Sequence, residues 1–77
     1  MKKDELARLL EAEGVREDMY WLEGGLPNEN HTLEQREDGW AVYYSQRGER
    51  SSEVVFATED EACAELYSRI MDDPTTR

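Results

Sequence analysis

Residues 58–71 read TEDEACAELYSRIM, and this segment carries the strongest local signals in the chain. Thr58 and Glu61 have the spacing of a capping box, the side-chain pair that satisfies free N–H groups at the start of a helix. The acidic residues at its start lie where the helix dipole favours negative charge. Apolar side chains then recur at helical spacing, at Ala62, Cys63, Leu66, Tyr67 and Ile70. The segment predicts a helix over residues 59–71, with a frayed tail from about residue 73.

The middle of the chain alternates apolar and polar residues, which is typical of β-strands. The alternation predicts strands at residues 32–36, 40–45 and 53–57, and Asp38-Gly39 predicts a hairpin between the first two. One face of this sheet would present Leu33, Trp40, Val42, Tyr44, Val54 and Phe56. The other would present Thr32, Glu34, Ala41, Tyr43 and Val55.

The N-terminal part adds a second helix and an irregular connection. Three leucines between residues 6 and 10 share one helical face, and Gly14 supplies a stop, so a short helix is predicted over residues 5–13. The apolar run MYWL at residues 19–22 is too short for periodicity to distinguish a strand from a turn of helix. Residues 23–28, EGGLPN, predict an ordered loop, because glycine allows positive φ and proline restricts the residue before it.

Together these elements predict one small α+β domain over residues 1–77. Its sheet would have three antiparallel strands, with the short N-terminal helix and the C-terminal helix packed on one face. If both helices cover the Trp40 face, the Tyr43 face is left open. An exposed Tyr43 would suit a binding surface, although it could equally pair with a cross-strand neighbour such as Val55.

The chain is strongly acidic. It has 19 acidic residues against 9 basic ones, for a net charge of -10. This charge argues against binding to nucleic acid or to an anionic membrane surface, because both need basic side chains to meet phosphate. A basic partner protein is the natural complement, although the charge could also serve solubility alone.

Few side chains suggest catalysis or a cofactor. Cys63 is the single cysteine, so it forms no intramolecular disulfide, and together with the absence of a signal-peptide pattern it favours a cytoplasmic protein. A nucleophilic pair of Cys63 with His31, the single histidine, is formally possible. Cysteine on the apolar side of a helix is more often a small hydrophobe. Capping and turn formation account for the acidic clusters at 59–61 and 37–38. We therefore expect no enzyme activity, no metal and no cofactor.

Three stretches resemble a group of small bacterial immunity proteins that are encoded beside polymorphic toxins. They are LEGGLP at residues 22–27, DGWAVYYSQRG at residues 38–48 and FATEDEAC at residues 56–63. The resemblance covers about residues 21–67 and is to proteins paired with toxins that carry a NAD-glycohydrolase domain related to the tuberculosis necrotizing toxin. The group has a glutamate before its Arg-Gly pair, where this chain has Gln46. The resemblance implies an immunity protein that binds the toxin domain and blocks its active site.

Three functions therefore remain open from the sequence. The first is an immunity protein, or antitoxin. The second is a generic acidic interaction or regulatory module, which could form a homodimer through an open sheet face. The third, a small enzyme, ranks last. For the first function, the expected contacts with the toxin combine a loop that can protrude with large aromatic side chains: Trp21, Glu23, Gly24, Gly25, Leu26, Pro27, Tyr43, Arg47 and Glu53.

Overall fold

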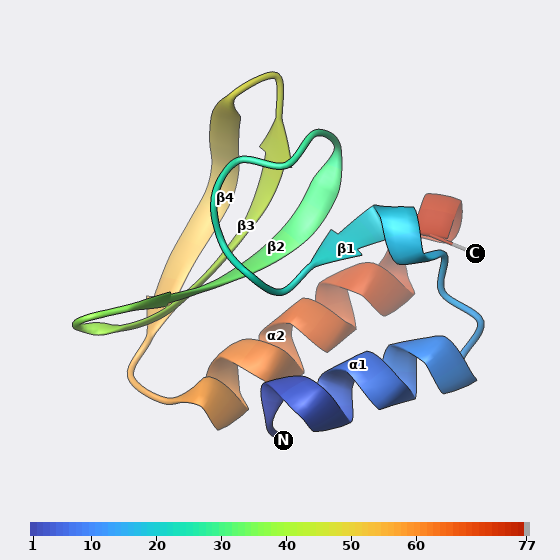
Figure 1. Cartoon of the computed structure of the whole chain (residues 1–77), viewed down its shortest axis with the longest axis horizontal. Helices are drawn as coiled ribbons and strands as arrows, with labels where there is room; N and C mark the ends of the chain where they lie inside the picture. The colour runs from blue at the N-terminus through green and yellow to red at the C-terminus, as the bar shows by residue number, and fades with distance from the viewer. Residues whose placement is uncertain (77) are drawn as a thin grey trace.

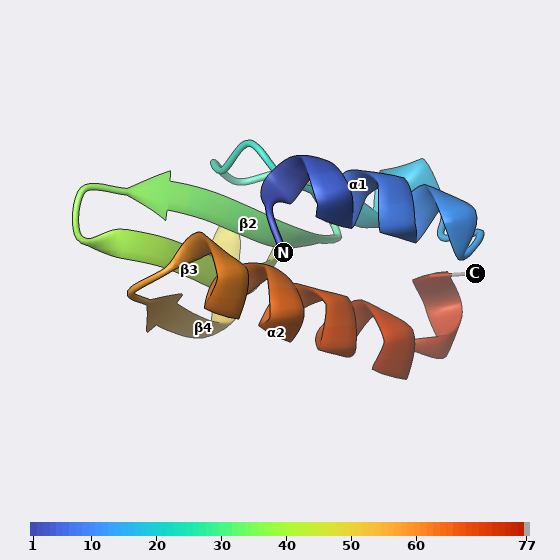
Figure 2. The same ribbon diagram turned by 90° about the horizontal axis from the view of Figure 1, so that it is seen from below.

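Two helices lie side by side against one face of a β-sheet in the computed structural model, which describes residues 1–76 (Figure 1). α1 spans Lys3–Ala12 and α2 spans Glu59–Asp72. The remaining elements are η1 (Glu17–Met19), β1 (Tyr20–Trp21), β2 (Asn30–Arg36), β3 (Gly39–Gln46), β4 (Glu49–Phe56) and η2 (Pro74–Thr76). Seen from below, α1 and α2 lie in front of the sheet, and the β2–β3 hairpin extends beyond them (Figure 2). The predicted α+β class, with a helix near each end of the chain, is confirmed.

The sheet contains four strands in the order β1-β2-β3-β4, so the expected three-stranded antiparallel sheet is wrong. β2, β3 and β4 do pair antiparallel in sequence order. β1 is the additional strand, and it runs parallel to β2, with Tyr20 opposite His31 and Trp21 opposite Thr32. The sheet is therefore mixed. β1 arises from the short apolar run at residues 19–22, whose conformation is decided by pairing with β2 rather than by a local pattern.

The hydrophobic core lies between the helices and one face of the sheet. Its larger aliphatic side chains have no exposed surface: Leu6 and Leu10 of α1, Leu33 of β2, Val42 of β3, and Leu66 and Ile70 of α2. Trp40 and Phe56 occupy paired positions on β3 and β4 and pack against this cluster, as the alternation predicts. Burying one such aliphatic side chain stabilises a fold by about 1.5–3 kcal/mol, so this layer supplies a large share of the stability.

α2 begins at the predicted cap and ends beside His31. The Glu61 N–H donates to Oγ1 of Thr58 at 3.2 Å, and Thr58 has the extended backbone of an N-cap residue.

Past the end of α2, Nε2 of His31 lies 2.9 Å from Oδ2 of Asp73. Hydrogen bonds from His31, and then from Thr75, lower the pKa of Asp73 to about 2. Among residues 1–76, neither helix combines the length and apolar character that a bilayer crossing requires.

Truncating a leucine should destabilise the protein only where that leucine is buried. Leu66 is 0% exposed in the core, whereas Leu26 is 51% exposed in a loop. We expect Leu66→Ala to lower the free energy of unfolding by about 2–5 kcal/mol, because it removes apolar contacts and leaves a cavity. Leu26→Ala should change it by less than about 0.5 kcal/mol. Urea denaturation of both variants measures the difference, and equal losses would contradict the proposed core.

The Asp73 carboxylate should make stability depend on pH in the acid range. A carboxyl whose pKa is lower in the folded protein stabilises the fold above its unfolded pKa, near 4, and loses this contribution as the pH falls through its folded pKa. The free energy of unfolding should therefore decrease between about pH 4 and pH 2, and Asp73→Asn should reduce that slope. Asp72→Asn, which removes the adjacent carboxyl, should leave the slope nearly unchanged. Acid titrations of the three proteins by circular dichroism test this, and it fails if Asp73→Asn keeps the wild-type slope.

Candidate functional site

Residues 22–29 form a loop that folds back over the outer face of the sheet, the face opposite the helices. The Gly24 N–H donates to the carbonyl of Leu33 at 3.0 Å, and the Gly25 N–H donates to Oε2 of Glu34 at 2.9 Å. Gly24 is buried with a φ of 72°, and a Cβ atom there would lie 2.9 Å from Cγ of Glu34. Residue 24 therefore favours glycine strongly. The hydrogen bonds hold the glycines of this loop against the sheet, so that part of the loop does not protrude.

Tyr43 lies beneath this loop, so the expectation of an open Tyr43 face is wrong. Tyr43 is 0% exposed, and its hydroxyl donates to the carbonyl of Gly25 at 2.5 Å. The guanidinium of Arg50 lies over the ring, 5.0 Å from its centroid. β4 bulges opposite Tyr43, and Val55, the expected cross-strand neighbour, pairs with Ala41. Burial raises the pKa of Tyr43. This side chain belongs to the packed interior and is not available as a surface contact.

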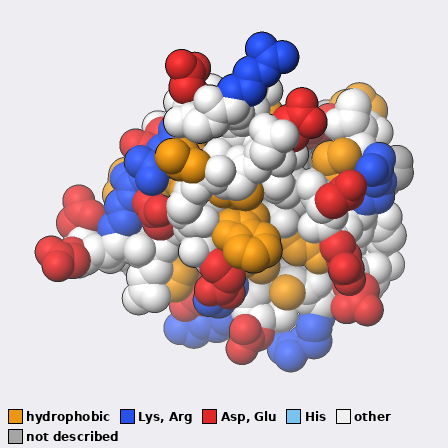
Figure 3. Space-filling view, turned by 45° about the horizontal axis from the view of Figure 1, so that its top comes forward, with side chains coloured by type: hydrophobic (Ala, Val, Ile, Leu, Met, Phe, Trp, Pro, Cys, Tyr) orange, Lys and Arg blue, Asp and Glu red, His pale blue; other side chains and the backbone are white. Residues whose placement is uncertain are grey.

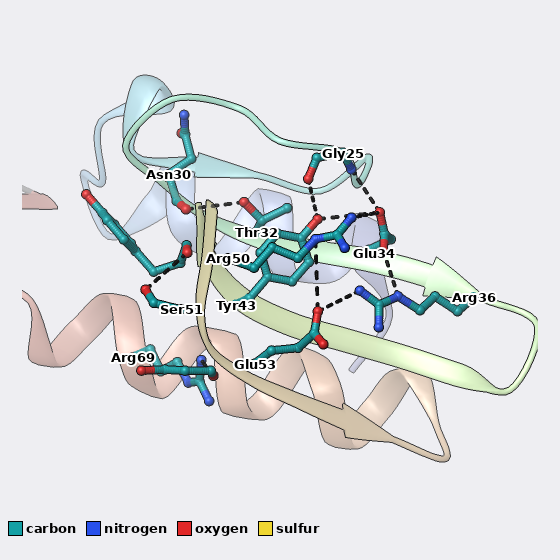
Figure 4. Close-up of polar contacts among 12 residues, drawn as sticks. Gly25, Asn30, Thr32, Glu34, Arg36, Tyr43, Arg50, Ser51, Glu53 and Arg69 are labelled. Atoms are coloured by element: carbon teal, nitrogen blue, oxygen red, sulfur yellow. Dashed lines mark hydrogen bonds and ion pairs between the residues drawn. The ribbon is translucent and has the colours of Figure 1, made fainter. Parts of the chain in front are cut away.

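Four charged side chains surround Tyr43 and connect β2 with β4 (Figure 4). Arg36 donates from Nε to Oε1 of Glu34 at 2.6 Å, and from Nη2 to Oε1 of Glu53 at 2.7 Å. Nη2 of Arg50 lies 3.6 Å from Oε2 of Glu34. The Gly25 N–H, and after it Arg36, hold the pKa of the Glu34 carboxyl below its usual value. The hydrogen bond from Arg36 likewise lowers the pKa of Glu53. Glu53, an expected toxin contact, therefore already has partners within the protein.

Three large hydrophobic side chains remain exposed on the outer face and are named here the outer patch: Trp21, Leu26 and Val55, which are 47%, 51% and 44% exposed. Trp21 pairs in parallel with Thr32 and shares the outer face with it. Val54 is 43% exposed, but alternation places it on the helix side of β4. Figure 3 brings the side away from the helices forward and shows hydrophobic side chains lying between acidic and basic ones. Exposed apolar side chains that share one face make that face a candidate for an interaction surface.

A cleft opens beside Trp21, between residues 16–21 and residues 28–30. Its acidic lining residues are Glu17, Asp18 and Glu29. Arg16 also lines the cleft, and its Nη2 lies 3.0 Å from Oδ2 of Asp18. Sequence reasoning selected Trp21 but none of the other residues of this cleft. Their local signal is an acidic pair before an apolar run, which is common on protein surfaces. Only the pairing of β1 with β2 brings the two segments together.

The other expected contacts occupy separate positions. Glu23 is exposed and its carboxylate lies 3.1 Å from Nζ of Lys3 at the start of α1. Pro27 is half-buried. Arg47 is exposed in the β3–β4 turn with a φ of 52°, and its N–H donates to Oδ1 of Asn28 at 3.4 Å. The structure thus brings Trp21 and the glycine loop to one face and ties Glu23 to the first helix.

A second hollow lies near the end of α2, where His31, Tyr44, Ser52 and Asp73 meet. Nε2 of His31 contacts Asp73, and the ring meets that of Tyr44 edge-on at a centroid distance of 5.0 Å. Cys63 is buried nine residues before the end of α2, roughly 14 Å along the helix axis, and burial raises its pKa. Cys63 and His31 therefore do not form the pair that the sequence left open.

Removing the Tyr43 hydroxyl should release the loop without opening the core. Tyr43→Phe keeps the ring and loses the hydrogen bond to Gly25, so we expect a loss of about 1 kcal/mol in the free energy of unfolding. The Gly25 amide should also exchange with solvent faster. Tyr44→Phe is the matched control, because the Tyr44 hydroxyl makes no hydrogen bond among residues 1–76. Urea denaturation and amide hydrogen exchange measure both effects. Equal behaviour of the two variants would show that the loop is held by other contacts.

The candidate site thus consists of the outer patch, the loop of residues 22–29 and the cleft beside Trp21. Within residues 1–76, no group of three or more potential metal ligands lies together. The exposed side chains of the outer patch and the acidic residues of the cleft offer apolar contact and negative charge. Comparisons of the chain with protein-family models, with curated proteins and with solved structures found no significant match.

Proposed function

We propose that this protein is an immunity protein that binds a cognate toxin domain and neutralises it. The toxin would be a NAD-glycohydrolase, and inhibition would be stoichiometric, by occlusion of its active site. The observation that carries the proposal is the outer patch, where Trp21, Leu26 and Val55 are exposed around a loop that is bonded to the sheet. The resemblance of residues 21–67 to such immunity proteins supports the class of toxin.

The geometry supports tight binding in two ways. First, hydrogen bonds to Leu33 and Glu34 order the glycine loop in the free protein, so little conformational entropy is lost when a partner binds it. Second, Trp21 offers a large rigid side chain, the type that dominates binding energy at protein interfaces. The surface needs no reacting group, because an inhibitor of this kind acts by excluding substrate.

The net charge of the chain also supports a toxin with a basic active-site rim as the partner. NAD carries an anionic pyrophosphate, so basic side chains around a cleft that binds it are favourable. A chain with a net charge of -10 is attracted to such a rim, and this attraction accelerates encounter. The alternative, a generic acidic module that forms a homodimer, would bring two chains of this charge together. That repulsion favours a basic partner over a second copy.

The test is inhibition by a pair of matched variants. Val55 and Val54 are adjacent and almost equally exposed, but they lie on opposite faces of β4. A cognate toxin domain is titrated with wild type, Val55→Lys and Val54→Lys while NAD loss is followed. We expect wild type and Val54→Lys to stop NAD loss at a one-to-one ratio, and Val55→Lys to bind at least tenfold more weakly. Association should also slow with added salt.

Two outcomes would contradict the proposal, the first its function and the second its binding surface. Undiminished NAD loss at a several-fold excess of wild type would reject inhibition of that toxin. If wild type inhibits fully and both lysine variants bind the toxin equally weakly, the protein is still an inhibitor, but the outer face is rejected as its binding surface.

A further inference from the structure

We infer that the cleft beside Trp21 receives an arginine or lysine side chain from a basic segment of the partner protein. The existence of a protein partner rests on the proposed function. The inference adds the position of one contact and its chemistry, and apart from Trp21 it concerns residues that sequence reasoning did not select.

Trp21 supplies the apolar wall of this site. It stands on the two-residue edge strand β1 and is 47% exposed at the rim of the cleft. Tyr20, the other residue of β1, instead packs against the hydrophobic core. An exposed indole is the best aromatic surface for a cation, which binds over the ring face. Arginine fits this wall particularly well, because its planar guanidinium stacks on aromatic rings and is weakly hydrated.

The charges of the cleft match a cation. Of its lining residues, Arg16 and Asp18 form an ion pair, so their charges cancel. Glu17 and Glu29 are left, and neither forms an ion pair among residues 1–76. Their negative charge acts on two nearby tyrosines. Burial is the main cause of the raised pKa of Tyr20, and the charge of Glu17 raises it further; the charge of Glu29 adds to burial in the same way at Tyr44. A concave site with one sign of charge concentrates counter-charges. A partner's basic side chain would thus meet two uncompensated carboxylates beside an indole.

The wall opposite Trp21 is held in place before binding. Asn30 Nδ2 donates to the carbonyl of Asn28 at 2.8 Å, and Oδ1 of Asn28 accepts the N–H of Arg47 at 3.4 Å. Between them, Glu29 has a φ of 55°, a backbone conformation that side chains other than glycine adopt uncommonly. These contacts preorganise the 28–30 segment, so a bound cation would not have to order it.

The choice of a basic protein segment follows from these charges. A nucleic acid or an anionic lipid would meet Glu17 and Glu29 with like charge. A second copy of the chain would bring 19 acidic residues with its 9 basic ones. A basic segment is the occupant whose charge is complementary both to the cleft and to the whole chain.

The direct test is a nuclear magnetic resonance titration of the intact 77-residue protein with the peptide acetyl-Gly-Arg-Arg-Arg-Gly-amide. The control peptide carries citrulline in place of arginine, which keeps the shape and removes the charge. We expect the arginine peptide to shift the Trp21 indole N–H and the amides of residues 16–21 and 28–30. The citrulline peptide should bind at least tenfold more weakly. Shifts spread over the whole surface, or equal binding of the two peptides, would overturn the inference.

Matched variants separate a specific site from a general attraction to negative charge. Glu17→Gln with Glu29→Gln should weaken arginine-peptide binding at least fivefold. Glu37→Gln with Glu49→Gln changes the net charge equally, at exposed positions outside the cleft, and should weaken it less than twofold. Trp21→Leu keeps an apolar side chain and should reduce the preference for arginine over citrulline. Equal effects of the two glutamine pairs would overturn the inference.

The toxin domain distinguishes this inference from the proposed function. If the toxin is inhibited equally well by wild type and by the Glu17→Gln, Glu29→Gln protein, the function stands and the cleft contact is rejected. If wild type does not inhibit the toxin at all, the function fails for that toxin. The peptide titration then still decides whether the cleft binds a basic side chain.

Discussion

The Glu34 carboxylate holds the loop of residues 22–29 on the sheet, and the arrangement of the outer face depends on this carboxylate. It accepts the N–H of Gly25 at 2.9 Å and the Nε of Arg36 at 2.6 Å, and its side chain occupies the space that a Cβ at residue 24 would need. A half-buried carboxylate is costly unless hydrogen bonds and opposite charges satisfy it. Because the backbone of the loop supplies one of those partners, the ion network and the position of the loop depend on each other.

This arrangement gives a short chain a second covered surface. A domain of this size buries a smaller fraction of its surface than a larger domain does, and α1 and α2 cover only one face of the sheet. The loop covers part of the other face and buries Tyr43, a large aromatic side chain. The cover is incomplete, and Trp21, Leu26 and Val55 remain exposed around it. The contacts that stabilise the outer face thus also define where a partner can make apolar contact.

Charge is distributed unevenly over the outer face. Near its centre, Glu34 and Glu53 are balanced by Arg36 and Arg50, so the middle of the surface is close to neutral. Uncompensated carboxylates lie at the edge, in the cleft beside Trp21. A neutral, partly apolar centre with charge at the rim is the usual anatomy of a protein interface, in which the rim governs encounter and specificity.

The sequence by itself determined the elements whose signals are local. The Thr58 cap, the apolar spacing of α2 and the alternation of β2 to β4 placed the C-terminal helix and three strands, and put Trp40 and Phe56 on one face. These signals sufficed because helix caps and strand alternation act over a few residues. Only the tertiary structure decided that Tyr20 and Trp21 form a parallel edge strand, that Tyr43 is buried, and that Glu17 and Glu29 meet across a cleft. The edge strand and the cleft depend on the pairing of β1 with β2, and the burial of Tyr43 depends on the loop that Gly24 and Gly25 attach to β2. These are contacts between separate segments, and no periodicity in four apolar residues or two glycines encodes such a partner.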